Sequence, residues 1–530
     1  MKMDRRSLFK LTAAAPVMAA PAPVASQGTR ILRFVPQADL AVTDPIFGIS
    51  FVTRNHAYLV FDYLYGQDAE GRPQPQMAEG HLREEDGRLW TIRLREGLRF
   101  HDGTPVLARD VVASLRRWGT RQAYAVSVFQ GLEELSAPDD RTIRFRFRQP
   151  FQLLPSLLGK PLNYPPAIMP ERLAGSTPAT QAVAEIIGSG PYRFVPGERI
   201  AGARAVYQRF DGYVPRPSGA VSGTAGPKVV HFDRVEWITM PDAATAAGAL
   251  QAGEVDWWEQ AAPDLLPRLR TRRDLVVETL DTSGFMAVMR FNHLVAPFDR
   301  PEIRRAFLGA FDQSDFMMAV VGDDPAYRHT GVGFFHPTSP NASSAGLDAL
   351  TRRSDAAIRS GLAAAGYNGE LVRLIGPVDL PPAHAMSQVA IDVFRRVGVN
   401  LDYVAVDWGT AVARLNSRNP ITQGGWSVTP NYTAGFITQD PTAHGFLRGI
   451  GTSAIFGWPT SAEIERLRSA WMDATDPAEQ HRIAEGMQLQ ALRDVPYVPL
   501  GGFTLASAYR RNLTGMLRGA LPAFWNVRRT

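Results

Sequence analysis

The residues best suited to contact a small molecule lie together at 424–432, which reads Gly-Gly-Trp-Ser-Val-Thr-Pro-Asn-Tyr. Trp426 follows two glycines and can present a large, rigid face to a pocket, and the Thr429 hydroxyl can exchange a hydrogen bond. Packing of Trp426 in the core is an equal alternative, because proteins normally bury large aromatics. Position in predicted loops adds three weaker candidate contacts: Asn431, Tyr432 and Phe503.

Three further tryptophans lie at the predicted ends of strands or loops, where they could form walls of the same pocket. They are Trp257, Trp258 and Trp408. Ligand pockets are mostly apolar with a few polar groups, which fits such walls. For these three residues, however, the sequence favours packing in the core.

Residues with the spacing of a catalytic or metal centre are missing from the sequence. It has no cysteine, and its ten histidines form no His-x-His or His-x-x-x-His pair. It also lacks Gly-x-Ser-x-Gly, the Walker A motif and the zinc-protease helix motif. We therefore expect no cofactor, no metal and no catalysis, although a hydrolase remains an alternative because a catalytic set needs only proximity in space.

The charge balance argues against a nucleic-acid partner. The chain of 530 residues has 57 Lys and Arg against 52 Asp and Glu, a net charge of +5. Lys2, Arg5, Arg6 and Lys10 against Asp4 account for +3 of this within residues 1–25. The remaining charges are scattered, without the basic stripe and interleaved aromatics of a nucleic-acid site.

The N-terminus has the pattern of an export signal. Arg5 and Arg6 precede an uncharged, alanine-rich stretch at 11–25, which predicts a signal peptide of the twin-arginine type over 1–26. The stretch contains three prolines and is shorter than the ~20 residues of a membrane span. We therefore expect cleavage near Ala25 or Ser26, no stable membrane insertion and a periplasmic location.

The elements that must position these residues alternate between strand and helix. At 89–94, Trp90, Ile92 and Leu94 alternate with polar residues, as in a half-buried strand, and a helix is predicted over 108–118 behind Pro105. Strand 235–240, helix 243–252 and strand 255–258 predict a βαβ unit and thus a parallel sheet. Further helices are predicted over 55–65 and 385–397.

The run from Leu89 to Ser114 resembles the signature of extracytoplasmic solute-binding proteins, family 5, of ABC importers, which capture peptides, nickel complexes and other solutes. A Gly-x-Gly-Pro-Tyr motif at 188–192 continues the resemblance. It implies an α/β fold with two lobes, a hinge and a cleft, and an additional domain inserted in the first lobe. The implied ranges are 28–65, 182–280 and 490–530 for lobe I, 66–181 for the inserted domain and 281–489 for lobe II.

The resemblance also implies the function: a monomer that binds a small or peptide-like solute and delivers it to the transmembrane subunits of an ABC permease. A periplasmic sensor or a chaperone-like binding protein is the alternative. Segment 424–432 is similar to the family's Gly-Trp-x-x-Asp-Tyr region, in which the aspartate receives the ammonium group of a peptide. Here that position holds Thr429, whose hydroxyl cannot neutralise a buried cation, which favours solutes without a free ammonium.

Overall fold

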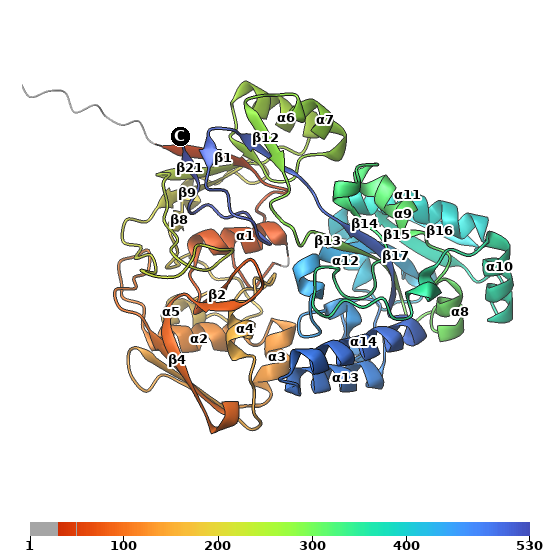
Figure 1. Ribbon diagram of the computed structural model, residues 1–530, viewed down its shortest axis with the longest axis horizontal. Helices are drawn as coiled ribbons and strands as arrows, with labels where there is room; N and C mark the ends of the chain where they lie inside the picture. The colour runs from red at the N-terminus through yellow and green to blue at the C-terminus, as the bar shows by residue number, and fades with distance from the viewer. Residues whose placement is uncertain (1–29, 49) are drawn as a thin grey trace, which may run out of the picture.

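The computed structural model describes residues 30–48 and 50–530, so the predicted signal peptide lies outside the described residues. A seven-stranded sheet forms the first lobe, with the order β12-β19-β11-β1-β10-β9-β8. It lies at the left and top of Figure 1. Its strands come from both ends and the middle of the chain: β1 (Ile31–Val35), β8 (Tyr192–Phe194), β9 (Arg204–Arg209), β10 (Arg234–Ile238), β11 (Trp257–Trp258), β12 (Leu275–Glu278) and β19 (Ser507–Arg510).

Strand β1 is the centre of this sheet, because both β10 and β11 pair with it in parallel. The crossover between them is helix α6 (Ala243–Ala252), which begins at the Asp242 cap and ends at Gly253 in the left-handed conformation. The predicted strand-helix-strand unit is thus present, with β1 inserted between its two strands. Two other helices belong to this lobe: α1 (Phe51–Val60) and α7 (Leu266–Arg270).

Between α1 and β8 of this lobe, the chain forms a separate four-stranded antiparallel sheet. Its order is β4-β5-β7-β6. Trp90, Ile92 and Leu94 of β5 face its core, as their alternation predicts. The elements of this inserted domain are β4 (Ala78–Glu84), β5 (Leu89–Leu94), α2 (Ala108–Trp118), α3 (Ala123–Phe129), β6 (Leu132–Ser136), β7 (Thr142–Phe147), α4 (Leu154–Gly159) and α5 (Glu171–Ala174).

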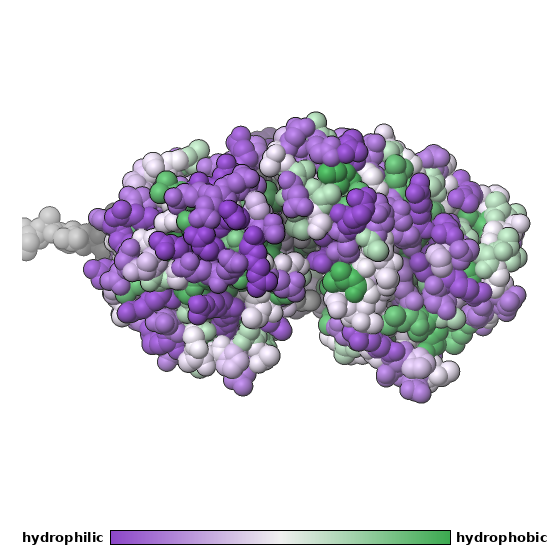
Figure 2. All heavy atoms as spheres, turned by 90° about the horizontal axis from the view of Figure 1, so that it is seen from below, coloured by the Kyte–Doolittle hydropathy of each residue, from purple (hydrophilic) through white to green (hydrophobic). Residues whose placement is uncertain are grey.

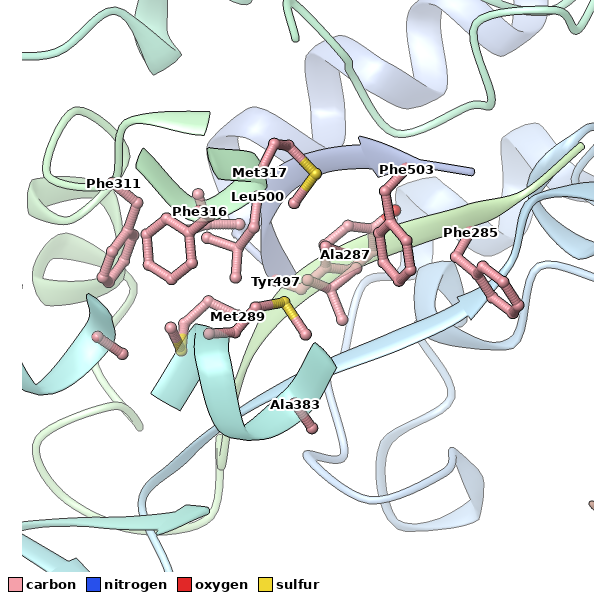
Figure 3. Packing of buried hydrophobic residues seen from close by; sticks show 14 of the residues in the cluster. Phe285, Ala287, Met289, Phe311, Phe316, Met317, Ala383, Tyr497, Leu500 and Phe503 are labelled. Carbon is pink, nitrogen blue, oxygen red and sulfur yellow. The ribbon is translucent and has the colours of Figure 1, made fainter. Parts of the chain in front are cut away.

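A six-stranded sheet with the order β14-β18-β13-β17-β15-β16 forms the second lobe, at the right of Figure 1. Every residue of β13 is buried between β17 and β18. In Figure 3, side chains of α9, β13 and β18 converge, with Phe285 and Phe503 at one end. The strands are β13 (Phe285–Phe291), β14 (Arg328–His329), β15 (Val372–Pro377), β16 (Leu401–Val406), β17 (Val428–Ala434) and β18 (Tyr497–Phe503). The helices are α8 (Pro301–Ala306), α9 (Gln313–Val321), α10 (Asp355–Ala364), α11 (Pro381–Arg396), α12 (Trp408–Leu415), α13 (Ala462–Asp473) and α14 (Pro477–Asp494).

The chain crosses between the lobes in two segments, 279–284 after β12 and 504–506 after β18. They touch at Gly284, where a β-carbon would lie 2.4 Å from the Phe503 carbonyl oxygen, so this close approach requires glycine. The prediction that residues 490–530 belong to lobe I is wrong for its first part, because β18 pairs with β13 in the second lobe. The helix predicted over 55–65 instead begins at Phe51, after the Ser50 cap, and ends at Val60.

Figure 2 shows the molecule hollowed between two rounded masses, with hydrophilic side chains over much of the face in view. Among residues 30–48 and 50–530, no helix is both long and apolar enough to cross a membrane.

Candidate functional site

A cavity lies where the two lobes meet the crossing segments, and it is called the interlobe cavity below. It holds about 560 Å³ of space, part of it continuous with solvent. All three regions supply its walls. Among the lining residues are Phe51, Arg54, Trp257 and Glu259 of the first lobe, Leu280, Asp281 and Leu505 of the crossing segments, and Phe285 and Ala434 of the second lobe.

Among the described residues, Arg54 is the one base that lines this cavity, and the residue is only 3 % exposed. Helix α1 places it there between Phe51 and Asn55. Its Nε and Nη2 atoms donate to Asn55 Oδ1 at 3.2 and 3.0 Å, and Nη2 also donates to the Ala520 carbonyl oxygen at 2.7 Å. The remaining nitrogen, Nη1, is buried and has no hydrogen-bond partner among the described residues. Burial lowers the pKa of Arg54, against the opposing pull of nearby carboxylates.

Glu259 follows β11 and extends a carboxyl group into the same cavity. Oε2 accepts a hydrogen bond from the Gln37 amide at 2.8 Å, and Oε1 accepts one from Asn55 Nδ2 at 3.0 Å. The side chain is half-buried, because part of it faces the cavity, but protein surrounds it. Burial raises the pKa of Glu259 to about 7, since these two donors and the Arg54 charge do not fully offset the lost hydration.

Asp281 supplies a second carboxyl group, from the crossing segment 279–284. Its Oδ1 accepts hydrogen bonds from the amide and hydroxyl of Ser283 at 2.9 and 2.5 Å and from the Gly284 amide at 3.1 Å. Burial raises the pKa of Asp281 as well, against these donors and the Arg54 charge. The cavity wall thus combines two half-buried acids with one buried base.

A second hollow, of about 920 Å³ including open solvent, adjoins the interlobe cavity and shares Gly519, Ala520 and Leu521 with it. Its walls include Asp68, Glu70 and Arg518, together with Phe436 of the second lobe. The space between the lobes therefore continues past the C-terminal segment 517–523.

The inserted domain also contacts the second lobe, through an ion pair. Lys160, which follows α4 and is 2 % exposed, donates to the Asp440 carboxylate and, at 3.3 Å, to Thr442 Oγ1. Burial works to raise the pKa of Asp440, but the Lys160 charge and the donors of Thr442 outweigh it and hold that pKa below its usual value. Leu162 of the inserted domain shares a small apolar cluster with Ala434 and Phe436 of the second lobe.

Of the residues predicted to contact a solute, Trp257 lines the interlobe cavity. Its indole nitrogen Nε1 is buried and has no acceptor among the described residues. Tyr432 and Phe503 lie one layer behind the wall, where both rings contact Phe285, at centroid distances of 5.4 and 5.1 Å. Burial raises the pKa of Tyr432 to about 12.

The structure places the other candidates in or near the core of a lobe. Trp426 is fully buried against Ile375, Leu415 and Trp458, and its indole N–H donates to the Leu415 carbonyl oxygen at 3.1 Å. The alternative of core packing therefore describes Trp426. Trp258 packs in the largest apolar cluster, which extends into the second lobe, and Trp408 packs half-buried at the start of α12.

Two polar candidates on β17 already use their side chains within the second lobe. Thr429 Oγ1 donates to the Ile375 carbonyl oxygen at 2.9 Å and is fully buried. Asn431 Oδ1 accepts from the Tyr432 amide at 2.7 Å. Neither Thr429 nor Asn431 lines the interlobe cavity.

Sequence reasoning missed the three ionisable residues of the cavity, Arg54, Glu259 and Asp281. A usable signal is the run Thr53-Arg54-Asn55-His56, four consecutive polar residues that are all buried in α1. Burying polar groups is costly unless they are bonded, so such a run points to a partner or a site. Within the described part of the chain, no three His, Cys, Asp or Glu side chains gather in a way that could hold a metal.

Comparison with known proteins assigns this two-lobed architecture. Residues 72–446 match the family model of bacterial extracellular solute-binding proteins, family 5. The chain is 33 % identical over the whole length of both chains to the probable peptide ABC transporter periplasmic-binding protein y4tO of Sinorhizobium fredii.

Solved structures share the fold. The binding protein AgaA from A. tumefaciens R10, in complex with agropinic acid, has a TM-score of 0.79 at 20 % identity and covers 95 % of this chain and 99 % of its own. The dipeptide-binding protein of Pseudoalteromonas sp. SM9913, in complex with Met-Leu, has a TM-score of 0.79 at 18 % identity, over 94 % of this chain and all of its own. The resemblance seen in the sequence is confirmed, and the chain belongs to the bacterial extracellular solute-binding proteins, family 5.

Proposed function

We propose that this chain captures a small organic or peptide-like solute in the interlobe cavity and delivers it to the membrane subunits of an ABC importer. The observation that carries this proposal is that both lobes and both crossing segments build one cavity. A solute in such a cavity contacts both lobes, and it favours their closed arrangement by the difference between its affinities for the closed and open forms. The name of the S. fredii relative supports delivery to an ABC transporter.

Contacts between the lobes then determine how much of the solute's binding free energy is needed to close the lobes. The Lys160–Asp440 pair and the apolar cluster of Leu162, Ala434 and Phe436 join the inserted domain to the second lobe. Opening the lobes would separate them and return both charges to water. The closed form is the one that a permease would recognise.

Export to the periplasm fits the same proposal. A twin-arginine signal over residues 1–26 would carry the folded chain across the inner membrane, and the protein would act there as a monomer. Replacing both Arg5 and Arg6 with lysine is expected to leave the unprocessed chain in the cytoplasm. Cell fractionation followed by mass measurement checks this, and unchanged processing of the variant would contradict a twin-arginine route.

The binding proposal is tested on protein that has been unfolded, dialysed and refolded to remove any retained solute. A small-molecule extract of the host's growth medium is added, and the melting temperature and radius of gyration are measured. We expect the melting temperature to rise and the radius of gyration to fall together, because binding and closure are coupled. A rise in melting temperature without any change in radius would contradict closure around a solute.

A further inference from the structure

Lysine is almost absent from this chain. The sequence has four lysines, and arginine supplies the rest of its 57 Lys and Arg residues. Two of the lysines, Lys2 and Lys10, lie in the predicted signal peptide, and the others are Lys160 and Lys228. These last two are 2 % and 0 % exposed, so no lysine amine reaches solvent in the part of the chain that the structure describes. Because lysine is rarely buried without a charged partner, each of the two needs a specific one.

Lys228 is buried by one lobe alone. Its ammonium group pairs with Asp62 at 2.8 Å, and both side chains are fully buried. The same ammonium lies 5.6 Å from the ring centroid of Tyr63 and 5.1 Å from that of Trp525. All four residues belong to the first lobe. Movement between the lobes therefore leaves the Lys228 amine covered.

Lys160 is buried across the interface between two domains. It follows α4 of the inserted domain, but both hydrogen-bond partners of its side chain, Asp440 and Thr442, lie in the second lobe. The Thr442 amide donates to Asp440 Oδ1 at 2.9 Å, so the second lobe itself orients the carboxylate. Separating the two domains would remove every side-chain partner that the structure gives Lys160.

Apolar side chains meet across the same interface. Leu162 shares a cluster with Ala434 and Phe436 of the second lobe. Met472 of α13 packs against the apolar core of the inserted domain, at the bottom of Figure 1. The interface between the two domains thus combines apolar contact with one ion pair.

The position and the type of this base both suit reversible contact. Neither Lys160 nor Asp440 lines the interlobe cavity, so their pair can influence closure without contacting a solute there. An ammonium group is a compact and strongly hydrated point charge, whereas a guanidinium is a planar fork that is hydrated more weakly. Lysine therefore fits between Asp440 and Thr442 in the closed form and regains good hydration when the lobes open.

We infer that Lys160 is the residue through which the inserted domain holds the second lobe closed. The second lobe covers the Lys160 amine when a solute is bound, and the amine faces solvent when the lobes are open. This inference rests on the proposed function and adds the inserted domain as the part that regulates closure. Lys160 positions the lobes and does not contact the solute.

The test is acetylation by acetic anhydride of solute-free protein, alone and with a small-molecule extract of the host's growth medium. The neutral amine nitrogen attacks an anhydride carbonyl carbon, acetate leaves as the C–O bond breaks, and the nitrogen loses a proton to solvent. A lysine-containing reference peptide in each reaction measures the reagent that the extract consumes. Mass analysis of peptides should show Lys160 acetylated in solute-free protein and about fivefold less with the extract, because the solute shifts the population to the closed form. Lys228 should stay unmodified in both reactions.

Asp440→Asn tests the ion pair itself. The variant keeps an oxygen that accepts from the Thr442 amide but removes the charge that faces Lys160. Acetylation of Lys160 should then persist with the extract. The extract concentration at half of the rise in melting temperature should increase by about tenfold or more, because closure would bury Lys160 without a counter-charge. Asp392→Asn, which removes the exposed partner of Arg396, should change neither result.

Three outcomes would overturn the inference and leave the proposed function intact, provided that the extract still raises the melting temperature. They are equal acetylation of Lys160 with and without the extract, acetylation of Lys228 together with Lys160, and an Asp440→Asn variant that behaves as wild type. An extract that changes neither the melting temperature nor the acetylation of Lys160 would overturn the proposed function as well.

Discussion

Replacing Glu259 with glutamine should stabilise the solute-free protein at neutral and alkaline pH, because the wild-type carboxyl group must ionise in a buried position. In the folded chain the pKa of Glu259 is raised from 4.5 to about 7, with burial as the largest cause. One pKa unit corresponds to about 1.4 kcal/mol. The shift therefore corresponds to a loss of about 3 kcal/mol in the free energy of unfolding once the pH exceeds the folded value.

The sign of this effect follows because the folded chain holds the Glu259 proton more tightly than the unfolded chain does. A carboxyl whose folded pKa is raised favours folding below its unfolded value of 4.5, and that advantage disappears as the pH rises through about 7. Glutamine does not ionise, so the variant avoids the loss. The glutamine side chain, however, presents an NH2 group to one of the two donors that Glu259 accepts from, the Gln37 amide or Asn55 Nδ2. Losing that hydrogen bond costs about 1 kcal/mol at any pH. The variant should thus be about 2 kcal/mol more stable at pH 8 and about 1 kcal/mol less stable near pH 4.

Urea unfolding of solute-free protein at both pH values measures this difference, with Glu463→Gln as the matched control. The charged groups that influence Glu259 are Arg54 on α1 and Asp281 in the crossing segment, and both remain in the variant. Ionised Asp281 raises the cost of ionising Glu259 further, and Arg54 lowers it. A Glu259→Gln variant that is less stable than wild type at pH 8, or whose difference from wild type is equal at the two pH values, would refute the reasoning.

Three other substitutions test separate parts of the account. Lys160→Met removes the ion pair between the inserted domain and the second lobe and should increase the radius of gyration in X-ray scattering. Arg482→Met, at an exposed pair with Glu479 on α14, should not, and an unchanged radius for Lys160→Met would argue against a closing role. Trp426→Ala should lower the free energy of unfolding by about 3–5 kcal/mol in urea titrations, because it empties a buried site; a full loss of binding with unchanged stability would instead make Trp426 a contact. Thr429→Asp should also destabilise the fold, by about 3 kcal/mol or more, because a carboxylate would face the Ile375 carbonyl oxygen; improved binding of free-ended dipeptides without loss of stability would contradict this.

Much of the fold could be predicted from local sequence patterns. The alternation at β5, the helix of α2 and the α6 helix ending at Gly253 all follow from periodicity and glycine chemistry, and the structure has them at or near the predicted bounds. Local patterns do not show which sheet a strand joins. Strand β18 was therefore assigned to the wrong lobe, because its pairing with β13 joins residues about 200 positions apart in the sequence.

The site was harder to predict for a related reason. A tryptophan in a glycine-rich segment has the same sequence pattern whether it faces a pocket or a core, and Trp426 lies in the core while Trp257 lines the cavity. Arg54 lies more than 200 positions before Glu259 and Asp281 in the sequence, and only the fold brings it to their cavity. The polar run inside buried helix α1 was the local pattern that could have pointed to them.

The most direct test of solute capture between the lobes is native mass spectrometry of the exported protein beside a denatured control, for wild type and for Arg54→Met. The account predicts that wild type carries one discrete extra mass that denaturation releases, and that Arg54→Met, folded as judged by circular dichroism, carries none. A mass retained equally by both proteins would contradict binding at the interlobe cavity. A wild-type protein that retains nothing, and whose melting temperature does not rise with an extract of its host's growth medium, would contradict solute capture itself.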